Sequence, residues 1–147
     1  NVLQSRRLGK AMEGCVHRGY AQLGGPVESL DQLHTQACLV HDLFLERVVR
    51  LAATHNALFR VRMPADFRGD PVFAPWGGEE ETRANFKLGG IKKVSGCVRK
   101  LDVAYASDVS RLLDVCRETL YFDTITDLRQ CLDDIRMDLS LDIVQVK

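Results

Sequence analysis

The sequence of 147 residues has no long apolar run, no excess charge of either sign and no paired-cysteine motif. No stretch approaches the roughly 18 consecutive apolar residues of a membrane-spanning helix, and no signal-peptide pattern opens the chain. The five cysteines are odd in number and include no Cys-x-x-Cys pair, which argues against a disulfide framework and a zinc ribbon. These absences predict a soluble protein of a reducing compartment, either the cytoplasm or an organelle interior.

A chain of this length can bury one sizeable core but not two large independent ones. We therefore expect one domain, or one domain with a helical extension. The chain starts at Asn1 and ends at Lys147 inside a strand-like run, which is compatible with a piece of a longer protein.

The 20 basic and 20 acidic side chains cancel in total but are unevenly distributed. Residues 83–117 carry eight basic and three acidic side chains, whereas residues 118–147 carry three basic and seven acidic ones. A basic segment favours a phosphate-bearing partner if the fold gathers its charges on one face, and otherwise forms a solvated surface. Nothing in it indicates nucleic acid specifically. Its basic residues are Arg83, Lys87, Lys92, Lys93, Arg99, Lys100, Arg111 and Arg117.

Apolar residues recur at helical spacing in the first part of the chain, predicting helices over residues 8–23 and 29–58. Three of the four prolines and the only tryptophan follow between residues 63 and 78, where regular structure should stop. Because large aromatic side chains are costly to leave in water, we expect Phe67, Phe73 and Trp76 to fold back onto the helices.

The second half of the chain alternates between helical and strand-like patterns. We expect a short strand and turn over residues 85–90, a helix over 91–104, a short helix from 107 or 108 to 116, a strand over 118–122, a helix over 124–139 and a strand over 142–146. The last three form a β-α-β unit. The predicted fold is α+β, with N-terminal amphipathic helices packed on a small mixed sheet that contains this unit. We divide the chain into a helical region (1–62), a loop rich in Pro, Gly and aromatic residues (63–84) and an α/β region (85–147).

Two clusters of reactive side chains lack the partners that would make them sites. His34, Cys38 and His41 share one face of a predicted helix, but no second cluster completes a metal site. Cys97 lies among cations that favour a thiolate, but no histidine near it in sequence can act as a base. The catalytic residues, if any, are therefore unknown.

Three segments of the second half follow a familiar order: FKLGGIKKVSGCVRKL, then SDVSRLLDVCRETLYFDTITDLRQCL, then DIVQVK. This order resembles the first half of the RelA/SpoT-like nucleotidyltransferase domain of alarmone synthetases and their divergent relatives. In that family a strand and helix bearing lysine and arginine precede an Asp at the edge of a strand. The resemblance covers about 60 of the 147 residues.

The resemblance implies a purine nucleotide, ATP or GTP, bound with Mg²⁺. Asp114 matches the family carboxylate that holds the metal; its alternative role is an ion pair with Arg111 or Arg117. Metal and cations on phosphate oxygens are what pyrophosphoryl transfer requires of a protein. The residues expected to bind the phosphates are Lys87, Lys92, Lys93, Arg99, Lys100 and Arg117.

The family's second catalytic acid lies beyond the strand matched by DIVQVK, outside this sequence. We therefore expect a divergent, incomplete domain that binds nucleotide and belongs to a larger pyrophosphate-transferring enzyme. The alternative is a non-catalytic helical assembly domain, or protein-interaction subunit, whose basic and acidic ends dock partner proteins.

Overall fold

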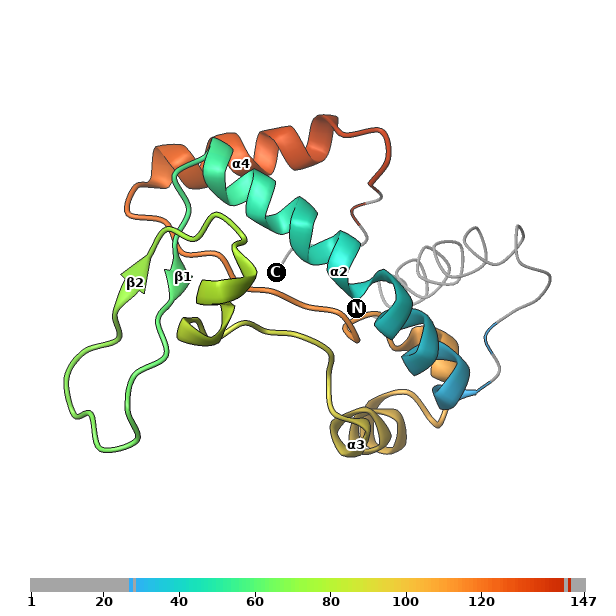
Figure 1. Ribbon diagram of the computed structural model, residues 1–147. Coiled ribbons are helices and arrows are strands. Elements are labelled where there is room, and N and C mark those ends of the chain that lie inside the picture. Colours follow the sequence, from blue (N-terminus) through green and yellow to red (C-terminus); the bar gives the residue numbers. More distant parts are fainter. Residues whose placement is uncertain (1–26, 28, 142, 144–147) are drawn as a thin grey trace. The chain divides into compact units, whose positions relative to one another are not determined.

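The computed structural model describes residue 27, residues 29–141 and residue 143 (Figure 1). Two short strands, two short 3-10 helical segments and three α-helices follow one another along these residues. In chain order they are α2 (Leu30–Thr54), β1 (Phe59–Arg60), β2 (Phe73–Ala74), η1 (Glu80–Asn85), α3 (Val94–Ala104), η2 (Val109–Arg111) and α4 (Ile125–Met137). None of the helices in the described ranges is long and apolar enough to cross a membrane.

The described residues form two compact units, each built from segments that are distant in sequence. Unit 1 contains residues 27, 29–40, 91–116, 139–141 and 143, and unit 2 contains residues 41–90 and 117–138. Both units therefore mix residues of the predicted regions 1–62 and 85–147. Helix α2 supplies residues to each unit, and each unit has its own hydrophobic core.

The core of unit 1 forms around one face of α3. Cys97 and Leu101, one helical turn apart, point to the same side of α3 and are buried. The segment after η2 adds Leu112, which is 1% exposed, and Val115. An antiparallel bridge between Ile91 and Cys116 joins the two ends of the segment 91–116, which contains α3 and η2.

The core of unit 2 is aromatic and centres on β1. Phe59 is 1% exposed and meets Trp76 edge to face, with ring centroids 5.4 Å apart. Trp76 also packs against Phe86, with ring centroids 5.6 Å apart. Strands β1 and β2 pair antiparallel, with Phe59 opposite Ala74. The buried members of this core are Leu45, Val49, Ala52, Ala57, Phe59, Trp76 and Phe86.

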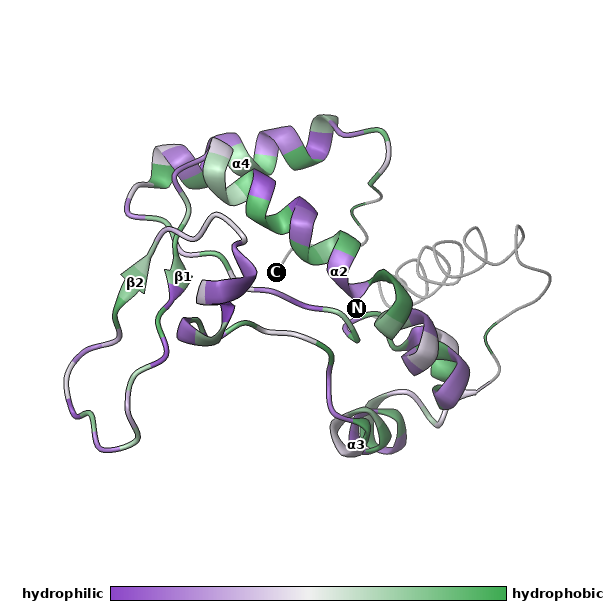
Figure 2. Cartoon of the chain, viewed as in Figure 1, coloured by the Kyte–Doolittle hydropathy of each residue, from purple (hydrophilic) through white to green (hydrophobic). Residues whose placement is uncertain are grey.

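Helix α4 begins at a side-chain cap and buries one stripe. The Thr124 hydroxyl accepts a hydrogen bond from the Asp127 backbone N–H at 3.1 Å, satisfying a donor of the first turn. Cys131 is buried, whereas Ile125 is 84% exposed. Figure 2 shows hydrophilic and hydrophobic residues alternating along this helix. His55, which directly follows α2, contacts α4 through Nε2, which lies 2.9 Å from Asp134 Oδ2.

The α+β class and the three longer predicted helices within the described ranges are confirmed, whereas the sheet lies elsewhere than predicted. The described sheet consists of β1 and β2, and the expected strand over 118–122 is reduced to one bridge between Tyr121 and Leu58. Glu118 explains part of this difference, because its carboxylate binds the Thr119 backbone N–H that a ladder would use. The partner strand over 142–146, like the helix over 8–23, lies outside the described residues apart from Ile143.

Two further local predictions were only partly correct. The short helix expected up to residue 116 ends at Arg111, because Leu112 and Val115 extend into the core of unit 1. Trp76 is buried as predicted, but Phe67 and Phe73 remain 41% and 36% exposed. Phe67 lies in the loop that joins β1 to β2 and is not part of the core of unit 2.

Candidate anion-binding site

Unit 1 holds a cluster of lysines around one carboxylate. Lys92 Nζ and Lys100 Nζ lie 2.9 Å and 2.8 Å from Asp114 Oδ2. Burial by itself raises the pKa of Asp114, but hydrogen bonds from Lys100 and Lys92 outweigh it, so the pKa of this carboxyl lies below its ordinary value. Lys100 also lies over the Tyr105 ring, 5.3 Å from its centroid. Both lysines therefore already have a negative partner.

The surroundings of Asp114 bear directly on the predicted magnesium site. Asp114 Oδ1 is buried without a hydrogen-bond partner and is the one oxygen left for a metal, but the ammonium groups on Oδ2 oppose a cation. Among the residues that the structure describes, no three His, Cys, Asp or Glu side chains form a metal-binding group. His34 instead contacts Cys38, and His41 contacts Asp42. Magnesium at Asp114 stays a prediction.

Two other predicted phosphate ligands lie at the surface of unit 1. Lys93 caps the start of α3 through its backbone, and Arg99 lies within the helix. Both side chains are exposed, and neither forms an ion pair with a described residue. Neither lines the pockets of unit 2 that are described below.

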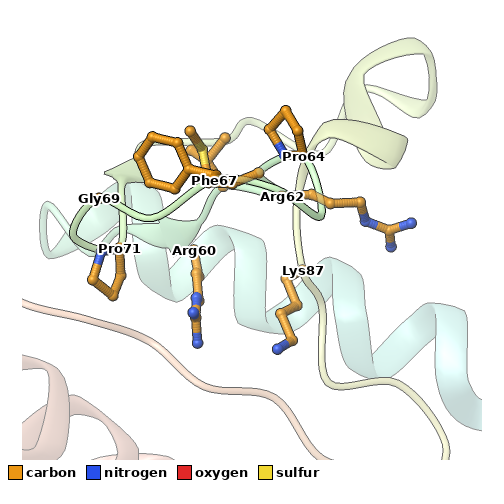
Figure 3. Close-up of a pocket in the computed structure, with 9 residues that line it drawn as sticks. Arg60, Arg62, Pro64, Phe67, Gly69, Pro71 and Lys87 are labelled. Carbon is orange, nitrogen blue, oxygen red and sulfur yellow. The ribbon is translucent and has the colours of Figure 1, made fainter.

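Unit 2 gathers a second group of cations in two adjoining pockets. One pocket, of about 440 Å³, is lined by Arg60, Arg62 and Lys87 together with residues of the β1–β2 loop (Figure 3). The other, of about 300 Å³, is lined by Arg60, Lys87 and Arg117 together with residues 88–89, 118–119 and 121. Arg60 and Lys87 line both pockets and extend in a common direction in Figure 3.

The strand register explains why these side chains converge. Phe59 and Phe86 point into the core, so the residues that follow them, Arg60 and Lys87, point to the opposite side. The Lys87 backbone N–H donates to the Arg60 carbonyl at 2.8 Å, which sets the two side by side. The core of unit 2 thus presents two cations on its outer face.

Close contact between the backbones of Gly89 and Arg117 places Arg117 in the pocket that Arg60 and Lys87 line. A Cβ atom on Gly89 would lie 2.4 Å from the Arg117 carbonyl oxygen, so only glycine permits this approach of the two backbones. The Gly89 N–H donates to both carboxylate oxygens of Glu118, each at 2.9 Å, and Thr119 N–H donates to one of them at 2.9 Å. The Glu118 carboxylate is therefore held by the backbone.

The cations of this site form no ion pair with a described residue, whereas most of the other arginines of unit 2 pair with an Asp or Glu; Arg68, in the β1–β2 loop, is also without a pair in the described part of the chain. Arg60, Arg62, Lys87 and Arg117 make no ion pair with any described residue, although Glu118 lies in the same pocket. The arginines that do pair with an Asp or Glu are Arg47, Arg50, Arg83, Arg129 and Arg136. Unit 2 therefore gathers four basic side chains at one place, where Glu118 is the one carboxylate among the residues that line the two pockets.

The sequence interpretation identified half of this group. Lys87 and Arg117 were predicted, and the structure brings them into one pocket. Arg60 and Arg62 were missed, although they alternate with apolar Phe59 and Val61 as outward-facing residues of a strand do. That alternation is a local signal that could have placed both side chains on the outer side of a strand.

Comparison with known proteins adds no relative: no protein-family model, curated protein or solved structure matches the chain. The candidate site therefore depends on the geometry of this chain alone.

Proposed function

We propose that unit 2 binds the phosphate groups of a nucleotide on Arg60, Lys87 and Arg117. The supporting observation is that these three cations line one pocket and lack a carboxylate partner among the described residues. Guanidinium groups match phosphate oxygens with paired hydrogen bonds, and lysine adds a compact point charge.

The proposed ligand is a purine nucleotide, ATP or GTP, accompanied by Mg²⁺, as the resemblance to the RelA/SpoT-like domain implies. In that proposal the chain contributes nucleotide binding to a larger pyrophosphate-transferring enzyme. The two adjoining pockets, of about 440 Å³ and 300 Å³, are in the size range of small-molecule sites. A polyphosphate fits the shared cations Arg60 and Lys87 because it carries several negative charges in a row.

The test is calorimetric titration of the chain with tripolyphosphate at low salt. Because hydrogen bonds between charged groups contribute about 1.5–3 kcal/mol, Lys87→Ala and Arg117→Ala should each weaken binding about tenfold or more. Raising the ionic strength from about 0.05 M to about 0.3 M should weaken binding further, since exposed charges are screened.

Lys93→Ala and Arg99→Ala are the matched controls, because each removes from unit 1 one exposed cation that has no ion pair with a described residue. They should change the affinity less than about twofold. Equal losses in all four variants would show a nonspecific response to net charge and would contradict the site. Absence of binding to the unmodified chain would favour the protein-interaction alternative.

A further inference from the structure

The larger of the two pockets in unit 2 has an apolar side as well as a cationic one. Arg60, Arg62 and Lys87 supply its charge, whereas Met63, Pro64, Phe67 and Pro71 from the β1–β2 loop supply apolar surface. Figure 3 shows the Phe67 ring lying over this loop, apart from the charged ends of Arg60 and Lys87. A ligand that spans the pocket therefore needs an apolar part and an anionic part.

Phe67 is held in place without being buried. Its backbone N–H donates to the Pro64 carbonyl at 3.1 Å, which fixes a turn. The outer edge of its ring packs against Gly69, where an added Cβ would lie 2.6 Å from Cζ. The residue is nevertheless 41% exposed. An ordered and exposed aromatic ring that shares a pocket with cations is a typical platform for stacking a nucleic acid base.

We infer that this pocket binds the aromatic base of the nucleotide, with Phe67 as its stacking partner, while the phosphates lie on Arg60, Lys87 and Arg117. This inference rests on the proposed function and adds the position of the base. The cavity of about 440 Å³ accommodates a base and its sugar, and it adjoins the phosphate pocket through the shared residues Arg60 and Lys87.

The experiment compares two probes, ATP and inorganic tripolyphosphate, titrated into the whole chain. Phe67→Ala should weaken ATP binding roughly tenfold, since loss of a base–aromatic stack has an effect of that order, and leave tripolyphosphate binding unchanged. Phe67→Trp retains an aromatic face and should restore the affinity for ATP. Val72→Ala, which removes another exposed apolar group of the same hairpin outside the pocket, should affect neither probe.

Gly69→Ala supplies a second variant that leaves Phe67 in the sequence. The added Cβ must displace the ring, so ATP binding should weaken while tripolyphosphate binding persists. If Phe67→Ala leaves both affinities unchanged or lowers them equally, the base site is wrong and the phosphate site stands. If tripolyphosphate does not bind the unmodified chain at all, the proposed function fails and the base site fails with it.

Discussion

The two cationic clusters of this chain differ in whether the protein supplies their counter-ion. In unit 1, Lys92 and Lys100 share Asp114. In unit 2, Arg60, Lys87 and Arg117 line one pocket and pair with no described carboxylate. The basic segment of the sequence contributes to both clusters, so the density of charge along the chain does not distinguish them. The two clusters are distinguished by whether a carboxylate forms an ion pair with their cations.

This difference changes what an external anion gains on binding. An anion that approaches Lys92 or Lys100 must compete with Asp114, whose hydrogen bonds to both lysines are already formed. An anion that approaches Lys87 or Arg117 meets charges whose attraction is still available. The cluster of unit 2 is therefore the better candidate for anion binding.

The largest expected effect tests which core supports the anion site. Phe59→Ala removes a fully buried ring from the core of unit 2 and should lower the free energy of unfolding by about 3–5 kcal/mol. Because Phe59 precedes Arg60 in β1, tripolyphosphate binding should be lost as well. Urea unfolding and calorimetry would measure the two effects.

The matched core variant is Leu112→Ala in unit 1, which should lower the free energy of unfolding by about 2–5 kcal/mol. Provided that circular dichroism shows a folded chain, its tripolyphosphate affinity should remain that of the unmodified protein. Loss of binding in folded Leu112→Ala would remove the distinction between the units.

A smaller effect is expected at the glycines beside Arg117. Gly89→Ala places a Cβ against backbone and should destabilise the chain by about 1–3 kcal/mol, as overpacking does, and weaken tripolyphosphate binding. Gly90 has a φ of 64° but no atom within 4 Å of an added Cβ. Gly90→Ala should therefore lower the free energy of unfolding by about 1–2 kcal/mol through backbone strain alone. Equal binding losses in the two variants would contradict the role assigned to Gly89.

The smallest effect is expected at the counter-ion of unit 1. Asp114→Asn should change the free energy of unfolding by only about 0–1 kcal/mol, because the Asp114 side chain is 41% exposed and solvent screens the pair. Since its pKa is lowered in the folded state, the stabilisation is present above the ordinary value of 3.8 and is lost as pH falls through the lowered pKa. The urea unfolding midpoints of Asp114→Asn and of the unmodified chain should therefore converge at acidic pH.

The same variant tests the predicted magnesium site. If Asp114 serves as the counter-ion of Lys92 and Lys100, Asp114→Asn should bind ATP with the same Mg²⁺ dependence as the unmodified chain. A clear loss of Mg²⁺ dependence in Asp114→Asn would establish the carboxylate as a metal ligand instead.

The helices could be predicted from the sequence because their signal is local. Apolar residues at a spacing of three and four predicted helices over 29–58, 91–104 and 124–139, and the structure has α2, α3 and α4 there. The sheet could not be predicted in the same way. Its strands have two residues each, and their pairing depends on an aromatic core assembled from distant segments.

The candidate site was only partly predictable for a related reason. Lys87 and Arg117 stand out as basic residues, but Arg60 joins them through the backbone bond from Lys87, which the sequence does not reveal. The counter-ion of Lys92 is equally hidden, since Asp114 lies 22 residues away along the chain. Whether a cation is paired inside the protein is a property of the fold.

The most direct measurement is a titration of the isotope-labelled chain with tripolyphosphate, followed by the backbone amide signals in nuclear magnetic resonance spectra. We expect saturable shifts at Arg60, at residues 87–89 and at residues 117–119, with residues 92–100 unaffected. Saturable shifts confined to residues 92–100 and Asp114 would place the anion on the lysine cluster of unit 1 and contradict the proposed site in unit 2.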